Sequence, residues 1–141
     1  MPGIYFHTEE VDFKLRNPKK IKSWISDVVL SARRKLVELN FILCKDQYLH
    51  KINLQYLDHD TYTDIITFDQ SENSTSIEGD IFISIERVKE NAKNLNIPFE
   101  DELHRVMIHG VLHLLGNEDK TEEEKALMRK KEEACLSLRP L

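Results

Sequence analysis

The sequence predicts an α+β fold in which one small, mixed, four-stranded sheet is covered by about five helices. Three observations lead to this prediction. The chain has 141 residues, enough for one hydrophobic core, and is expected to form a single domain over residues 1–141. Its hydrophobic share of 40% and its charged share of 32% are near globular averages. Segments typical of strands and of helices follow one another in the order β-α-β-α-β-β-α-α-α.

The first part of the chain is expected to form two strands and two helices. Apolar residues predict a short strand over residues 3–8. Asn17 followed by Pro18 is typical of a helix cap and a first helical position. Apolar residues at helical spacing then predict one long amphipathic helix with a buried stripe of Ile21, Trp24, Ile25, Val28, Ala32, Leu36 and Leu39. A strand over residues 41–44 and a helix over residues 46–57 follow.

The middle of the chain is expected to add two strands and two helices. The segments 64–69 and 79–85 are rich in β-branched and aromatic residues, which favours strands separated by a polar loop. The pattern is then helical over residues 86–96. Pro98 separates this helix from the next one, which runs to about Leu115.

Clear boundary signals mark the C-terminal part. Gly116 is expected to stop the preceding helix. Thr121 and Glu124 match a capping box, in which each side chain satisfies a free backbone N–H of the other residue. The final helix that follows is expected to bury Leu127, Met128, Ala134, Cys135 and Leu138.

Composition narrows the classes of protein and partner. The net charge of −5 argues against broad, charge-driven binding of nucleic acid, so an RNA substrate would need a local basic groove. The densest basic clusters outside the last helix are interpreted as solvated faces: Lys19, Lys20, Lys22, Arg33, Arg34 and Lys35. The sequence shows no membrane span and no signal peptide, so a cytoplasmic location is expected. Cys44 and Cys135 are expected to be buried free thiols because neither belongs to a C-x-x-C pair.

The segment 109–119 carries a candidate metal site. His109 and His113 are four residues apart, so on a helix both imidazoles can point at one ion, although such a pair also occurs without metal. Gly116 can reverse the chain and bring Asp119 back to the last helical turn, as the glycine turn of metzincins delivers a third ligand. Glu118 is the competing third ligand. Spacing favours Asp119.

The ligand set indicates catalysis rather than structural zinc. Two histidines and a carboxylate leave the fourth position of a tetrahedral zinc ion for water. Zinc lowers the pKa of that water from 15.7 to about 7. One zinc ion per chain is therefore expected. Zinc peptidases of the H-E-x-x-H type carry a glutamate after the first histidine, and here Gly110 stands at that position.

Together these residues resemble the YbeY family of rRNA maturation endoribonucleases, whose signature is H-G-x-L-H-L-x-G-Y-D-H. The upstream segments Asn53-Leu54-x-Tyr56, Thr63-Asp64-Ile65-Ile66-Thr67-Phe68 and Gly79-Asp80-Ile81 resemble the family's N-x-x-Y-R, T-D-V-L-S-F and G-D-I segments in order and spacing. The resemblance extends from about Phe41 to Glu132. It implies a single-strand-specific endoribonuclease with one zinc ion, held by His109, His113 and position 119, acting in 16S rRNA 3′ end processing and ribosome quality control. Its implied partners are ribosomal RNA and the small ribosomal subunit.

The sequence departs from the family signature at three positions. Aspartate at position 119 replaces histidine, Leu57 replaces an arginine expected to contact substrate phosphate, and Asn117 replaces tyrosine. Arg105, one turn before His109, is expected to supply the missing positive charge. The alternative for Arg105 is an ordinary ion pair with Glu102 or Asp101.

Other candidate residues and functions remain open. Asp64 and Asp80 are interpreted as structural caps rather than catalytic carboxylates. The remaining histidines have no partner at ligand spacing and are expected to be structural or exposed: His7, His50, His59 and His104. A zinc-dependent metallopeptidase and a metal-binding ribosome-associated factor with little activity are the two alternative functions. The sequence leaves the oligomeric state open.

Overall fold

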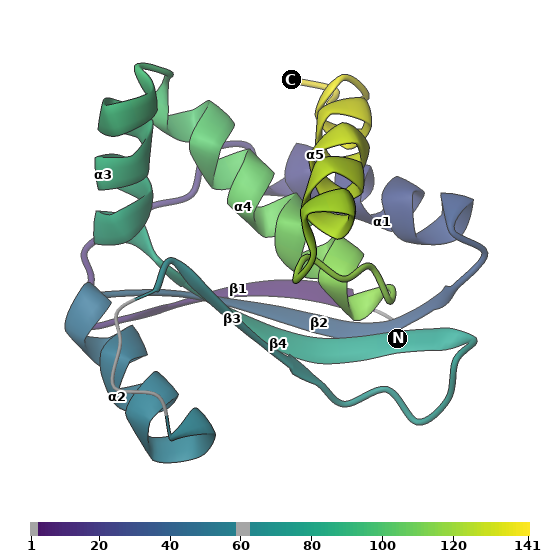
Figure 1. The fold of residues 1–141 in the computed structure, drawn as a ribbon, viewed down its shortest axis with the longest axis horizontal. Helices are drawn as coiled ribbons and strands as arrows, with labels where there is room; N and C mark the ends of the chain where they lie inside the picture. The colour runs from purple at the N-terminus through teal and green to yellow at the C-terminus, as the bar shows by residue number, and fades with distance from the viewer. Residues whose placement is uncertain (1–2, 59–62) are drawn as a thin grey trace.

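The computed structural model describes residues 3–58 and 63–141, and in this part of the chain a mixed four-stranded sheet is accompanied by five helices (Figure 1). The elements in chain order are β1 (Gly3–Glu9), α1 (Pro18–Ser31), β2 (Lys35–Cys44), α2 (Asp46–Leu57), β3 (Ile65–Asp69), β4 (Ser76–Ser84), α3 (Ile85–Leu95), α4 (Phe99–Leu114) and α5 (Glu122–Leu136). The strand order is β1-β2-β4-β3. The β1–β2 and β2–β4 pairs are parallel, and β3 runs antiparallel to β4. The predicted α+β class with a mixed four-stranded sheet is confirmed.

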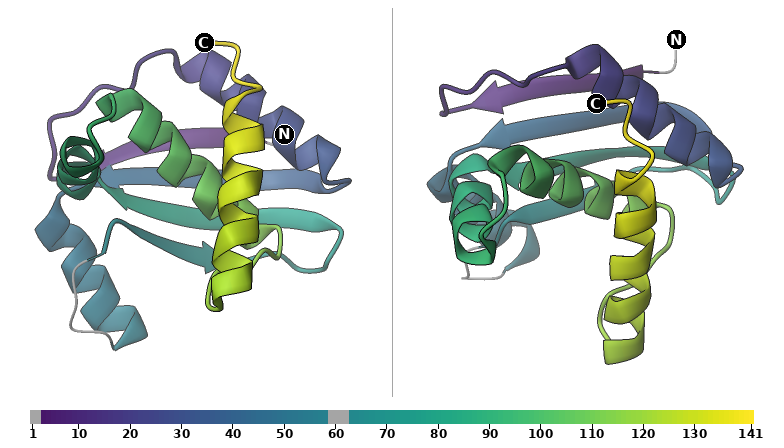
Figure 2. Two further views of the ribbon diagram at one scale, coloured as in Figure 1. Left: turned by 45° about the horizontal axis from the view of Figure 1, so that its top comes forward. Right: turned by 90° about the horizontal axis from the view of Figure 1, so that it is seen from above.

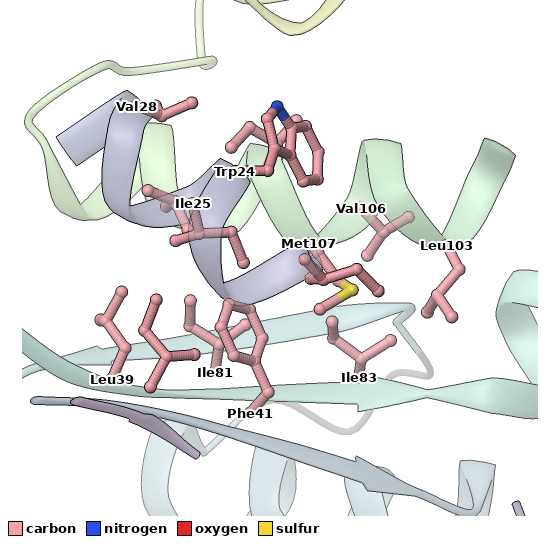
Figure 3. Packing of buried hydrophobic residues seen from close by; sticks show 14 of the residues in the cluster. Trp24, Ile25, Val28, Leu39, Phe41, Ile81, Ile83, Leu103, Val106 and Met107 are labelled. Carbon is pink, nitrogen blue, oxygen red and sulfur yellow. The ribbon is translucent and has the colours of Figure 1, made fainter. Parts of the chain in front are cut away.

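The helices cover the two faces of the sheet unequally. Helices α1, α3, α4 and α5 lie on one face, whereas α2 lies on the other (Figures 1 and 2). Alternate residues of β2 and β4, including Phe41 and Ile81, point at α1 and α4 and form the main core with Trp24 and Met107 (Figure 3). A smaller cluster under α2 contains Cys44, Leu49 and Ile66. Helix α4, packed on the sheet along much of its length, is therefore a rigid support for side chains on its outer face.

The prediction of one long helix through Leu39 is wrong. Helix α1 ends at Ser31, and Arg33 takes a left-handed conformation with φ of 59°. Leu36 and Leu39 lie in β2, yet both pack against the main core. The register of β2 against β4 shifts between Leu36 and Glu38, and such a bulge brings residues three apart to the same face. Leu36 and Leu39 therefore share a buried face of a strand at the three-residue spacing that is typical of a helix.

The two predicted helix caps have different outcomes. Helix α1 begins at Pro18 as expected, but Asn17 has φ of 54° and its side chain caps no backbone N–H. The capping box of α5 is confirmed, because Glu124 N–H donates to Thr121 Oγ1 at 3.1 Å and Thr121 N–H donates to Glu124 Oε1 at 2.9 Å. The start of α5 is therefore fixed by its own side chains.

The predicted buried face of α5 is only partly correct. Met128 is buried and Cys135 is half-buried, but Ala134 is exposed, as are 52% of Leu127 and 71% of Leu138. Helix α5 contacts α4. The side of α5 that carries Met128 and Cys135 also carries Glu132, an acidic residue that is buried between them. Apolar residues alone therefore do not reveal which face of α5 is buried.

Two further expectations concern thiols and membrane spans. Cys44 is a buried free thiol, as predicted, whereas Cys135 is free but only half-buried. None of the helices within residues 3–58 and 63–141 has the length and apolar character needed to span a membrane.

Candidate metal centre

The end of α4 is a tight turn that reverses the chain. Gly116 has φ of +103°, a conformation that glycine adopts without the steric cost of a Cβ atom. Its N–H donates to the carbonyl of His113 at 3.0 Å, and the N–H of Asn117 donates to the carbonyl of Leu112 at 3.1 Å. These two bonds form a Schellman motif, as the sequence predicts for a glycine that ends a helix. The turn returns residues 117–119 to the last turns of α4.

Asp119 and both histidines of the segment line one cleft. Asp119 Oδ2 lies 3.3 Å from His109 Nε2, and His113 lines the same cleft one helical turn further along. The cleft has a volume of about 280 Å³, and β3 with the residues before it forms the opposite wall through Thr63, Asp64, Ile65 and Thr67. Glu118 is exposed and lies outside this lining. Within residues 3–58 and 63–141, no three His, Cys, Asp or Glu side chains are close enough, as they stand, to hold a metal ion together.

The ring nitrogens of the two histidines are oriented by hydrogen bonds on their far sides. His109 Nδ1 donates to Glu132 Oε2 at 2.6 Å, and His113 Nδ1 donates to the carbonyl oxygen of Asn117 at 3.2 Å. Because oxygen is the acceptor in both bonds, the Nδ1 atoms carry protons, and a ring with one proton then has its lone pair on Nε2. Metal-bound histidines in proteins almost always make such a second hydrogen bond. By residue type, two imidazoles and a carboxylate that line one cleft suit a divalent ion.

A buried ion-pair network lies behind His109. Glu132 on α5 accepts a bond from Arg105 Nη1 at 3.1 Å. The guanidinium of Arg105 forms a fork with Glu102, whose Oε1 and Oε2 each lie 2.8 Å from an Arg105 nitrogen. Glu102 and Glu132 are only 0% and 3% exposed. The network therefore joins α5 to one face of α4 beneath the cleft.

The network shifts the pKa values of its members. The hydrogen bond to Glu132 raises the pKa of His109 above its ordinary value, although burial acts in the opposite direction. Burial raises the pKa of Glu132, but the bond from His109 and the charge of Arg105 outweigh it and hold this pKa below its usual range. Glu132 is therefore ionised near neutral pH, and it presents a charged acceptor to His109.

Arg105 does not lie free for a phosphate. Its side chain is 33% exposed and borders a side cavity that His109 and Asp119 also line. Its donors are directed at Glu102 and Glu132, which matches the alternative of an ion pair with Glu102. Asp101 pairs with Arg139 instead. The structure thus makes Arg105 part of the support of His109.

The cleft continues along the edge of the sheet. A second cavity of about 340 Å³ extends to Asn53 and Leu57 of α2. It shares four lining residues with the first: Thr63, Ile65, Thr67 and His113. Leu57 is 40% exposed at this point. The position at which the family signature carries an arginine thus borders the groove, and in this chain it is apolar.

The position after the first histidine is closed to a large side chain. Gly110 is buried, and a Cβ atom there would lie 2.9 Å from Ile65 Cδ1 and 3.0 Å from Ile81 Cγ2. The sheet occupies the space that the glutamate of an H-E-x-x-H peptidase would need. The structure therefore gives a packing reason for the missing base.

The two aspartates interpreted as caps act differently. Asp64 accepts a bond from Asn91 Nδ2 at 3.2 Å and lines the cleft. Asp80 lies outside the cleft and accepts bonds from Asn40 Nδ2 at 3.2 Å and Gln70 Nε2 at 3.5 Å. Both carboxylates make structural bonds.

The remaining described histidines lie away from the cleft. His7 pairs with Asn40 Oδ1 at 2.9 Å. His104 is buried beside Trp24, and its Nδ1 accepts a bond from Arg139 Nη1 at 2.7 Å. His50 lies on α2 and does not line the cleft. The prediction for His59 lies outside the described residues.

Sequence reasoning missed Glu132. It lies four residues after Met128 and three before Cys135, on the stripe of α5 that packs against α4. An acidic residue at helical spacing between apolar ones is the signal that marks it. Buried carboxylates are rare unless they are paired, so such a position indicates a cationic or hydrogen-bonding partner.

Comparisons with known proteins agree with this geometry. The family model described as "Endoribonuclease YbeY" matches residues 4–138. Proteins named Endoribonuclease YbeY are 52% identical over 136 residues in Cytophaga hutchinsonii, covering 96% of this chain and 95% of that protein, and 56% identical over 130 residues in Amoebophilus asiaticus, covering 92% and 88%. The fold is similar to the solution structure of TM1509 from Thermotoga maritima, with a TM-score of 0.61 and 24% identity over 94% of this chain and 87% of that one. The chain belongs to the YbeY family of endoribonucleases.

Proposed function

We propose that this protein is a cytoplasmic, zinc-dependent endoribonuclease that cleaves single-stranded ribosomal RNA in 16S rRNA 3′ end processing and ribosome quality control. One zinc ion per chain is held by His109, His113 and Asp119. The family membership supports the nuclease activity, since the relatives carry the name endoribonuclease. The metal, the ribosomal substrate and the association with the small ribosomal subunit are our proposals.

One observation carries the metal assignment. Both histidines bind oxygen acceptors through Nδ1, so that their Nε2 atoms remain available in a cleft that also holds the Asp119 carboxylate. Two nitrogen donors and one oxygen donor suit a tetrahedral zinc ion with one position left for a water molecule. When bound, zinc supplies Lewis-acid activation of that water, whose pKa falls to about 7.

The walls of the cleft favour an extended RNA strand. A cavity of about 280 Å³ shares part of its lining with one of about 340 Å³, and both follow β3, the edge strand of the sheet. Thr63 and Thr67 line both cavities, and Thr63 Oγ1 donates to the carbonyl of Ile65 at 3.4 Å. Of the described lining residues only Arg105 is cationic, and two carboxylates neutralise it. The positive charge needed to hold a phosphate must therefore come mainly from the metal or from a partner.

The peptidase alternative lacks support at the site. Peptide hydrolysis needs a group that accepts a proton and returns it to the leaving amine. The sheet packed against Gly110 leaves no space for the usual glutamate at that position. Stabilisation of charge at a phosphate does not require that residue.

The test uses the purified full chain and three substrates. A single-stranded RNA with the sequence of the small-subunit rRNA 3′ end, the same RNA as a duplex, and casein are each incubated with the zinc-loaded protein. We expect cleavage of the single strand only, and its loss in His113→Ala together with loss of zinc measured by elemental analysis. The matched control His7→Ala replaces a histidine outside the cleft and should retain both.

Three outcomes would contradict the proposal. Casein turnover that His113→Ala abolishes, with intact RNA, would make the protein a peptidase. Zinc binding without turnover of either substrate would favour a metal-binding ribosome-associated factor. Equal zinc content in wild type and His113→Ala would remove the metal site.

A further inference from the structure

We infer that Glu132, held in place by Arg105 and Glu102, is the positioning residue that makes His109 a strong metal ligand. The inference rests on the proposed metal site and concerns a residue of α5, an element that contributes none of the three proposed ligands. It assigns a function to a buried charge network that the proposed cleavage reaction does not itself require.

The geometry around Glu132 assigns one carboxylate oxygen to each neighbour. Oε2 accepts from His109 Nδ1 at 2.6 Å, and Oε1 accepts from Arg105 Nη1 at 3.1 Å. The side chain of Glu132 is 5% exposed, so the environment around it strengthens both bonds relative to water. The first bond fixes which nitrogen of His109 is protonated and how the ring is turned. It also raises the electron density on Nε2, which makes that atom a better donor to a cation.

Arg105 and Glu102 hold the Glu132 carboxylate in position. A carboxylate at this buried position needs a cationic partner, and Arg105 Nη1 lies 3.1 Å from Glu132 Oε1. Arg105 is itself held by the fork to Glu102, which is fully buried. The three side chains carry a net charge of −1 directly behind His109, and this charge favours a divalent cation at its other nitrogen.

The two histidines are supported differently. His113 donates its Nδ1 proton to a neutral backbone carbonyl at 3.2 Å, within the turn that follows its own helix. His109 donates to a charged side chain from another helix at 2.6 Å. Charge-assisted hydrogen bonds are shorter and roughly twice as strong as neutral ones. The metal affinity should therefore depend on the docking of α5 through His109.

The decisive experiment measures zinc affinity by chelator competition at one fixed pH, with zinc alone as the probe. Glu132→Gln keeps the shape of the side chain, but its single carbonyl oxygen cannot accept from both His109 and Arg105. We expect zinc binding to weaken about 10–100-fold, the effect typical of removing such a supporting carboxylate. Arg105→Lys, which cannot bridge both glutamates with the same geometry, should weaken it less.

Thr121→Ala is the matched control on the same helix. It removes the capping box of α5, whose two hydrogen bonds join Thr121 and Glu124 at the exposed start of the helix. This variant should bind zinc as the wild type does. Urea unfolding of the metal-free variants reports any loss of folding separately. Should Glu132→Gln fail to fold, Arg105→Lys provides the same comparison.

A spectroscopic readout separates positioning from a purely structural role. In the zinc-loaded wild type, NMR should detect a far-downfield, slowly exchanging proton on His109 Nδ1, and this signal should move upfield in Glu132→Gln. Unchanged zinc affinity and an unchanged proton signal in Glu132→Gln would overturn the inference. Equal loss of affinity in Thr121→Ala would overturn it as well, because the effect would then come from α5 as a whole.

The histidine variants distinguish failure of this inference from failure of the proposed site. If His109→Ala and His113→Ala both lose zinc while Glu132→Gln does not, only the role of Glu132 is refuted. If neither histidine variant loses zinc, the metal site itself is wrong.

Discussion

Substitution of Gly116 tests how Asp119 reaches the cleft. The residue has φ of +103°, which lies beyond the left-handed region where asparagine or aspartate is tolerated. Gly116→Ala would force a Cβ atom into this conformation at a cost of about 1–2 kcal/mol. A Cβ atom there would meet Arg34 Nη2 only at 4.0 Å, so no steric clash adds to the backbone strain. The lower entropy of the unfolded alanine chain offsets roughly 0.4–1 kcal/mol.

The expected net loss is therefore about 1 kcal/mol in the free energy of unfolding, or roughly 3–6 °C in Tm for a chain of this size. Urea and thermal unfolding with a chelator present would measure it without any contribution from metal. Arg33→Gly is the control, since Arg33 has φ of 59° after α1, and glycine there should not destabilise the protein. Zinc affinity should fall in Gly116→Ala only. Unchanged stability together with unchanged zinc affinity would show that the turn is not left-handed and does not place Asp119.

Three further predictions concern the groove, the buried histidine and the thiols. Leu57→Arg places a cation at the edge of the groove and should tighten binding of single-stranded RNA. For one added phosphate contact, the log–log slope of affinity against salt concentration should become steeper by about 0.7. Leu54→Arg, on the same helix but outside the groove lining, is the control, and an equal gain in affinity there would show that only the net charge matters. Burial and the neighbouring Arg139 lower the pKa of His104 below its unfolded value of 6.5. The stabilising contribution of the neutral His104 should therefore be fully present above pH 6.5 and be lost as the pH falls below it. The free energy of unfolding should fall by at most about 1.4 kcal/mol per pH unit. His104→Gln should make the free energy of unfolding less dependent on pH in urea unfolding from roughly pH 7.5 to 5.5, the range around the unfolded histidine pKa. An unchanged pH dependence in this variant would contradict the prediction. Burial raises the pKa of Cys44 to about 12, so iodoacetamide should modify Cys135 first in the native protein, and mass spectrometry showing Cys44 labelled first would be inconsistent with its burial.

The sequence predicted the elements that are controlled by local signals. Thr121 and Gly116 act within their own turn of chain, and their hydrogen bonds follow the expected patterns. The β-branched run of β4 and the proline before α4 are equally local. The end of α1 was not predictable in this way, because Leu36 and Leu39 share a face only through a bulge against β4, and sheet register depends on the partner strand.

The candidate site shows the same division. His109, His113 and Asp119 were found because they lie within eleven residues on one helix and its turn, so their spacing alone brings them to one cleft. Glu132 was missed because its contact with His109 depends on how α5 packs against α4. The hydrogen-bond partners of Arg105 could be predicted only in part for the same reason. Glu102 lies one turn away on the same helix and was foreseeable, whereas Glu132 belongs to another helix.

A crystal structure of the zinc-loaded protein, with anomalous data collected at the zinc edge, tests the proposed metal centre most directly. It should show one zinc peak per chain bonded to His109 Nε2, His113 Nε2 and an Asp119 oxygen at about 2.0–2.2 Å. The Nδ1 atoms should keep their bonds to Glu132 and to the carbonyl of Asn117. A zinc ion bound through either Nδ1 atom, or a peak located away from the cleft, would contradict the proposed centre.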